Sequence, residues 1–225
     1  MIETLVLNDI RYIKKDPMYM IVFILPIILG CVYKFLLLNI DFIKPYMYVA
    51  KYLFTLIVPV MVGMLLGFRV LEEKDEKVIS VYATSPLGIK GYVNYRLFQS
   101  LILGLIEVMI LSLFGIISEY NFIFTIIISV LLSPCIFLIL AIMGKNKIQG
   151  MILLKLVGIF TMIPILQVIK DNKWDVLFKI IPTDFILNSN LGNSASYMGI
   201  IYIVEIIIAM IVMISYFYKK CLKDI

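Results

Sequence analysis

Two glutamates interrupt segments of this chain that are otherwise nearly free of charge. Glu107 lies about midway along one apolar segment, and Glu205 lies in the outer half of another. A carboxylate in hydrocarbon costs on the order of 3 kcal/mol, so its presence needs a reason such as a cavity, a cation or water. We expect Glu107 to face a cavity, where it contacts a cationic substrate or pairs with a basic residue, and we take Glu205, Gln99 and Gln167 as weaker candidates for the substrate pathway. The alternatives are a buried, protonated helix contact at Glu107 and nearby water at Glu205.

A second candidate is the charged connection over residues 70–96. Val78 and Tyr82 fall on one helical face with charged residues around the rest, which predicts a short amphipathic helix over residues 72–84. The segment 85–88, Ser-Pro-Leu-Gly, then predicts the end of that helix. Such a helix is either a solvated connection or a surface on which a soluble partner docks.

The chain lacks the residues of several catalytic chemistries. It has no histidine, which excludes imidazole bases, Ser-His triads and His-ligated metals. It has no G-x-x-x-x-G-K-[ST] phosphate loop, because residues 143–147, Met-Gly-Lys-Asn-Lys, lack the leading glycine and the hydroxyl. No two aspartates share an apolar segment, so a membrane protease or phospholipid synthase is not expected. We predict no catalytic residue, metal site or cofactor in this chain.

The elements that carry these residues are apolar helices. The chain of 225 residues is 63% hydrophobic and 16% charged, whereas a soluble domain is about half apolar and about a quarter charged. A span needs roughly 20 apolar residues. The sequence therefore predicts an all-α polytopic membrane protein, a single domain over residues 1–225, with spans at about residues 18–38, 52–69, 97–118, 121–143, 150–169 and 199–218.

Two segments outside the spans have their own patterns. Residues 1–16 are amphipathic and end at Asp16-Pro17, which predicts an elbow helix on the membrane surface, with a frayed terminus as the alternative. Residues 170–198 connect the last two spans, and their middle is apolar. We expect this external segment to lie in the interface or to re-enter the bilayer, with Trp174 at the headgroup level.

The distribution of Lys and Arg predicts the orientation. With the N-terminus in the cytoplasm, the inner segments carry Arg11, Lys14, Lys15, Arg69, Lys74, Lys77, Lys90, Arg96, Lys145, Lys147, Lys219, Lys220 and Lys223. The outer segments carry far fewer, namely Lys44, Lys51, Lys170, Lys173 and Lys179. Because cytoplasmic loops are rich in Lys and Arg, both termini are expected in the cytoplasm.

Small residues mark faces on which helices approach closely. Gly63 and Gly67 form a small-xxx-small pair in the second predicted span, and Ser100 and Gly104 form another in the third. Such a face mediates either contact between two subunits or helix packing within one subunit.

The charged connection resembles the hallmark loop of type-2 ATP-binding-cassette (ABC) exporter permeases. It has an acidic-basic-acidic start at residues 73–76, a short helix, then Ser85-Pro86, and finally Tyr92, Tyr95 and Arg96 leading into the third span. It is most similar to the small fluoroquinolone-type drug-export permeases. The resemblance extends over the whole chain as six spans with an N-terminal elbow helix and an external re-entrant segment. One departure is Lys77-Val78, where members usually have Gly-Thr. A glycine at this position relaxes the backbone at the start of the helix.

This resemblance implies a permease subunit that moves an amphipathic drug, peptide or lipid-like substrate out of the cell. A separate nucleotide-binding subunit would bind ATP and Mg²⁺, and a second permease, identical or a sister, would complete a dimer in the bacterial plasma membrane. The ATPase would dock on the loop helix, the coupling helix of the family, and on the elbow, through Glu72, Glu73, Lys74, Asp75, Glu76, Val78, Tyr82, Pro86, Arg11, Lys14 and Lys15. The alternative function is a six-span substrate-capture component of a vitamin or micronutrient uptake system, which would bind its ligand without an ATPase docked on residues 72–84.

Overall fold

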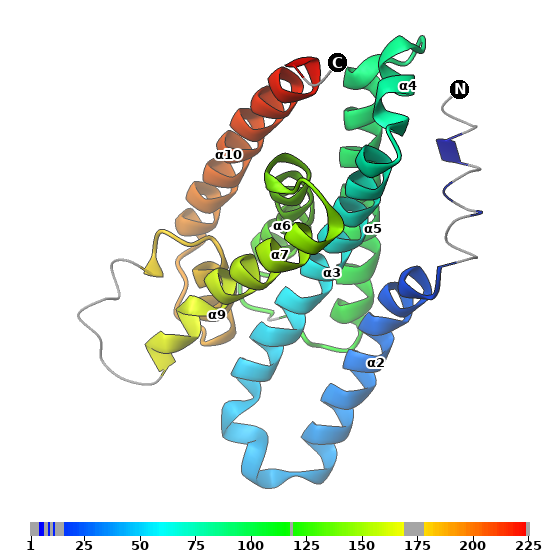
Figure 1. The fold of residues 1–225 in the computed structure, drawn as a ribbon. Helices are drawn as coiled ribbons and strands as arrows, with labels where there is room; N and C mark the ends of the chain where they lie inside the picture. Colours follow the sequence, from blue (N-terminus) through cyan, green and yellow to red (C-terminus); the bar gives the residue numbers. More distant parts are fainter. Residues whose placement is uncertain are drawn as a thin grey trace.

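The computed structural model describes residues 5, 6, 9, 11, 16–117, 119–168 and 178–223, and these residues form helices and no strands (Figure 1). In chain order the elements are α2 (Pro17–Asn39), η1 (Asp41–Tyr46), α3 (Met47–Asp75), α4 (Val78–Thr84), α5 (Gly88–Leu113), α6 (Phe122–Met143), α7 (Lys147–Met162), η2 (Ile163–Val168), α9 (Thr183–Asn190) and α10 (Ser196–Lys223). Within this part of the chain, α2, α3 with η1, α5, α6, α7 with η2, and α10 are each long and apolar enough to cross a membrane. The predicted six-span, all-α fold is confirmed.

The predicted boundaries fail in one region, the connection between the second and third spans. α3 continues through Asp75, while α5 begins at Gly88 and ends at Leu113. The predicted single helix over residues 72–84 is therefore wrong. Its first residues belong to the last turn of α3, and Lys77, with a φ of 57°, separates that turn from α4.

α3 and α6 form the centre of the bundle. Their most apolar stretches are 67% and 72% buried, whereas those of α7 and α10 are only 11% and 17% buried. Gly63 and Gly67 allow α3 to lie directly on α6, because a Cβ at Gly63 would meet the Ser133 carbonyl oxygen at 2.6 Å and one at Gly67 would meet the Leu140 side chain at 2.7 Å. Each of the other four spans packs against one or both of these central helices.

The bundle has two polar ends, which we call the α4 end and the α9 end after the short helix at each (Figure 1). At the α9 end, Pro164 has no N–H to donate to the Thr161 carbonyl. The hydroxyls of Tyr52 and Thr183 donate to this carbonyl instead, at 2.7 and 2.9 Å. These bonds join α3, the end of α7 and the start of α9.

The predicted elbow and external segment are described only in part. Leu5, Val6, Asp9 and Arg11 are helical, and the other residues before Asp16 lie outside the described residues. Residues 169–177, with Trp174, also lie outside them. α9 packs against α3 and α6 with Phe185, Ile186 and Leu187 buried, and its entry into the bilayer stays a prediction.

Candidate functional site

Arg96 occupies the centre of a buried charged cluster at the α4 end. Its side chain is 1% exposed, although it lies only two turns into α5. One guanidinium nitrogen, Nη1, donates to Asp9 Oδ2 at 2.8 Å and to Gln99 Oε1 at 2.9 Å, while Nη2 donates to Glu73 Oε1 at 2.6 Å. A buried cation is tolerated only where such partners replace water. Arg96 therefore joins the N-terminal segment, the last turns of α3, and α5.

Glu73 is the second member of this cluster and is also buried, at 2% exposure. Besides the bond from Arg96, it faces Arg69 Nε at 3.2 Å, and the Tyr92 hydroxyl donates to its Oε2. Charge-assisted bonds of this kind are about twice as strong as neutral ones. The carboxylate is held from two helices at once, α3 and α5.

Asp9 links the cluster to the segment before the first span. The Tyr95 hydroxyl donates to Asp9 Oδ2 at 2.7 Å, beside the bond from Arg96. The rings of Tyr92 and Tyr95 also lie 5.5 Å from the Arg96 guanidinium carbon, at cation-π distance. We call the set Asp9, Arg69, Glu73, Tyr92, Tyr95, Arg96 and Gln99 the Arg96 cluster.

α4 rests directly on this cluster. The Tyr82 ring stacks on Tyr92 with centroids 4.9 Å apart. Burial raises the pKa of the Tyr82 phenol, and the nearby Glu73 charge raises it further. The backbone turn that leads into α4 needs Lys77 in the left-handed region, with φ 57° and ψ 20°. The resemblance leads us to expect glycine at this position, so the lysine is accommodated at the cost of strain.

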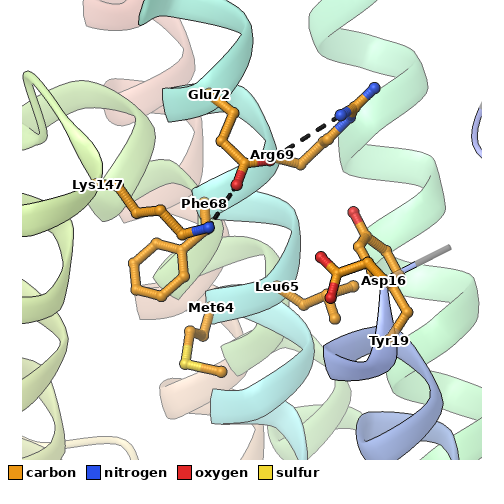
Figure 2. A pocket seen from close by; sticks show the side chains of 8 residues that line it. All are labelled: Asp16, Tyr19, Met64, Leu65, Phe68, Arg69, Glu72 and Lys147. Atoms are coloured by element: carbon orange, nitrogen blue, oxygen red, sulfur yellow. Dashed lines mark hydrogen bonds and ion pairs between the residues drawn. The ribbon is translucent and has the colours of Figure 1, made fainter. Parts of the chain in front are cut away.

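The predicted docking residues separate into three groups. Glu73 is buried in the Arg96 cluster, and Val78, Tyr82 and Lys74 are half-buried, with Lys74 donating to the Ala141 carbonyl at the end of α6. Figure 2 shows Glu72 lying between Lys147 of α7 and Arg69, which it faces at 3.9 Å, beside a cavity of about 20 Å³. The exposed members are Asp75, Glu76, Pro86 and Arg11, while Lys14 and Lys15 lie outside the described residues.

One exposed docking candidate escaped sequence reasoning. Val81 on α4 is 63% exposed, although it lies outside the six spans. The helical periodicity of the sequence placed Tyr82 on the apolar face of the helix. In the structure this face is turned inward, with the Tyr82 ring stacked on Tyr92. Val81 is an apolar side chain on the outer face of the same helix, and this was the signal in the sequence that could have identified it.

The predicted pathway residues lie in four different surroundings. Gln99 belongs to the Arg96 cluster, and Gln167 donates to Asp184 at the α9 end. Glu107 is 1% exposed, and neither carboxylate oxygen has a hydrogen-bond partner in the part of the chain that the structure describes. Glu205 is exposed and lines a large apolar cleft. The structure does not bring these residues together.

The α9 end has a polar cluster of its own, centred on Asp184. Its carboxylate accepts from Gln167 and, at 3.2 Å, from the Tyr202 hydroxyl, and the Asn188 amide donates to its carbonyl at 3.1 Å. Burial raises the pKa of Asp184, and the bond from Gln167 opposes that rise. Sequence reasoning placed Asp184 in a loop and missed this role, because the partners come from η2 and α10.

The small residues contact α6 within the same chain. Gly63 and Gly67 face Ser133 and Leu140, as described above, and a Cβ at Gly104 would meet the Ser133 Cβ at 3.3 Å. Ser100 and Ser133 share a hydrogen bond of 2.7 Å between their hydroxyls. Their role in the described chain is packing within one subunit, and a role between subunits stays a prediction.

Six apolar helices, with a buried charged cluster at one end and a large apolar cleft, define a multi-pass membrane protein. Residues 9–218 match the family described as fluoroquinolones export permease protein Rv2686c-like, so the chain belongs to this family. The class is that of the membrane component of a transporter, not that of an enzyme. No curated protein and no solved structure matches the chain.

Proposed function

We propose that this chain is the permease subunit of an ABC drug exporter, driven by a separate ATPase that docks at the α4 end. The name of its family supports drug export, and fluoroquinolones in that name suggest an amphipathic drug as the substrate. The chain has no phosphate loop, so ATP and Mg²⁺ would bind to the partner. The family match favours this function over the capture component of a micronutrient uptake system.

In this proposal the α4 end faces the cytoplasm of a bacterial cell, with both termini on that side. The excess of Lys and Arg in the segments at this end supports the orientation. A second permease, identical or a sister, would complete the transport pathway, because α7 and α10 leave most of their surface uncovered. Six spans suggest that each subunit forms half of the pathway.

One observation carries the docking role: the exposed surface of α4 lies on top of the Arg96 cluster. Val81 and the turn around Asp75 and Glu76 are open to a partner, while Tyr82 of the same helix stacks on Tyr92. A force applied to α4 therefore reaches α3, α5 and the N-terminal segment through buried ion pairs. Such a path couples nucleotide-driven motion outside the membrane to the spans.

The test is a charge placed on the exposed face of α4. Val81→Glu is expected to abolish both co-purification of the ATPase and ATP-driven drug efflux, while the permease still folds, because Val81 makes little contact within the chain. Leu191→Glu is the matched control, since it adds the same charge to an exposed apolar residue at the α9 end. Unchanged co-purification and efflux with Val81→Glu would overturn the docking surface.

A further inference from the structure

A cleft of about 770 Å³ lies between α6, α7, α10 and the residues that lead into α9. Its walls are apolar side chains such as Ile139 of α6, Phe160 of α7 and Ala209 of α10. Pockets that hold drug-sized molecules have volumes of about 300–1,000 Å³. The cleft therefore has the size and the lining of a small-molecule site.

Glu205 is the one acidic or basic side chain among the described residues that line this cleft. It has no ion pair or hydrogen bond to any residue that the structure describes. It follows Tyr202, which contacts Asp184, by about one turn, so it lies toward the α9 end of the cleft. An unpaired carboxylate beside apolar walls is costly unless a ligand brings a positive charge.

The cleft extends well beyond Glu205 toward the α4 end of the bundle. Along α6 its lining runs from Leu132 to Met143, a length of roughly 16 Å at 1.5 Å per residue. Met213 of α10 lines it together with Met143. The cleft thus has one anionic side chain near one end and an uncharged apolar lining along the rest of its length.

Its mouth opens where α7 and α10 have exposed apolar side chains. Leu156, Ile159 and Phe160 of α7 are 59%, 66% and 54% exposed, as expected for a surface in contact with lipid. A lipid acyl chain would cover these walls but would leave Glu205 without a counter-charge. A second copy of the chain would have to bury the carboxylate, which is unfavourable without a cation.

We propose that this cleft binds amphipathic organic cations from the lipid phase, with the apolar body between α6, α7 and α10 and the positive charge against Glu205. As a substrate site, it rests on the export function proposed above. Binding itself needs neither ATP nor the ATPase. The ligand class follows from charge complementarity and from the apolar lining.

The test uses tetraphenylphosphonium, a lipophilic monovalent cation, with purified full-length permease in phosphatidylcholine nanodiscs. Saturable binding of the radiolabelled cation is expected, and Glu205→Gln should raise its Kd about tenfold or more because the charge interaction with the carboxylate is lost beside apolar walls. Glu119→Gln is the matched control, since it removes an exposed carboxylate that does not line the cleft. Its Kd should equal that of the wild type.

Two further measurements separate the contribution of the ligand's charge to binding from the contribution of the shape of the cleft. Tetraphenylborate has nearly the same size and the opposite charge, and it should show no saturable binding. Ala209→Trp, which fills the cleft, should abolish cation binding while the protein remains folded and keeps its oligomeric state.

Three results would overturn the inference: no saturable cation binding, equal Kd values for wild type and Glu205→Gln, or dissociation of a dimer by Ala209→Trp without an effect on binding. The last result would assign the cleft to a second copy. Failure of the binding assay with intact ATP-driven efflux would reject only this site. Intact binding without ATP-driven efflux would reject the proposed function instead.

Discussion

Glu73 and Glu107 are both buried in the same bundle, with 2% and 1% of their surface exposed, but their surroundings are opposite. Glu73 accepts from Arg96 and Tyr92 and faces Arg69. Glu107 lies on α5, the helix that carries Arg96, and both of its oxygens lack a hydrogen-bond donor among the described residues. The first region can retain a charge, whereas an unpaired buried carboxyl is stable only as the neutral acid.

The two surroundings differ in how strongly the neighbouring residues depend on the carboxyl group. The Arg96 cluster joins three segments through groups that cannot be removed singly without leaving a buried charge unpaired. Glu107, by contrast, accepts no hydrogen bond from any residue that the structure describes. We therefore expect mutations to have large effects at the α4 end and small ones around Glu107.

The largest effect is expected from Arg96→Met. It leaves Glu73 and Asp9 buried without their cation, so the free energy of unfolding should fall by about 3–5 kcal/mol. The measurement is reversible unfolding of the purified permease in mixed detergent micelles. Lys90→Met removes an exposed cation from the first turn of α5 and should change stability by at most about 0.5 kcal/mol. Equal stabilities of the two variants would contradict a closed cluster.

The same substitution at both glutamates sharpens the comparison. Glu73→Gln should cost about 2–3 kcal/mol, because it weakens charged hydrogen bonds in a buried site. Glu107→Gln should change the free energy of unfolding by less than about 1 kcal/mol, since no bond to a protein group is lost. A large loss of stability in Glu107→Gln would show that the carboxyl has a partner in the folded bundle.

Glu107→Gln also tests the pathway prediction. Efflux of cationic substrates should be unchanged, because Glu107 is buried and does not line the cleft of Glu205. A specific loss of cation efflux in this variant would restore Glu107 as a pathway residue.

A smaller effect is expected from Tyr95→Phe. It deletes the hydroxyl that donates to Asp9, a hydrogen bond to a charged group that contributes about 1.5 kcal/mol or somewhat more. Protease cleavage between Asp9 and the first span should become faster than in the wild type, because Asp9 loses one of the two side-chain hydrogen bonds that the structure describes for it. Tyr197→Phe, at an exposed tyrosine of α10, is the control. An unchanged cleavage rate in Tyr95→Phe would mean that Arg96 alone holds Asp9.

The smallest effect concerns the turn before α4. Lys77→Gly removes the strain of a left-handed lysine and should raise the free energy of unfolding by about 1 kcal/mol. Lys77→Ala keeps the Cβ and should bring no gain, which separates backbone strain from loss of the charge. A loss of stability in the glycine variant would indicate that the lysine side chain contributes more than the strain costs.

The six spans were predictable because long apolar runs leave no other stable arrangement in a membrane. The boundaries around the second connection were not, since Glu72 and Glu73 were assigned to a separate helix over residues 72–84 of that connection. In the structure their charges are matched by Lys147, Arg69 and Arg96, so α3 continues where its sequence stops being apolar. A carboxylate paired across the bundle cannot be distinguished from a solvated one by sequence alone.

The candidate site was predictable only in its parts. The tyrosines and the arginine at the start of α5 were recognised through the family resemblance, while the bond from Arg96 to Asp9 joins residues 87 positions apart. The sequence showed that Lys77 departs from the expected glycine. The structure shows the physical consequence, which is a lysine with left-handed backbone angles. Long-range pairing was the missing information in each case.

The role of the α4 end depends most directly on the energetic coupling between Glu73 and Arg96. A double-mutant cycle with Glu73→Gln, Arg96→Met and the double variant measures that coupling in the free energy of unfolding. If the pair is the buried centre of the α4 end, the double variant should lose at least about 2 kcal/mol less than the sum of the single variants. Additive losses, within about 0.5 kcal/mol, would show that the two side chains do not support each other and would contradict the cluster as the link between α4 and the spans.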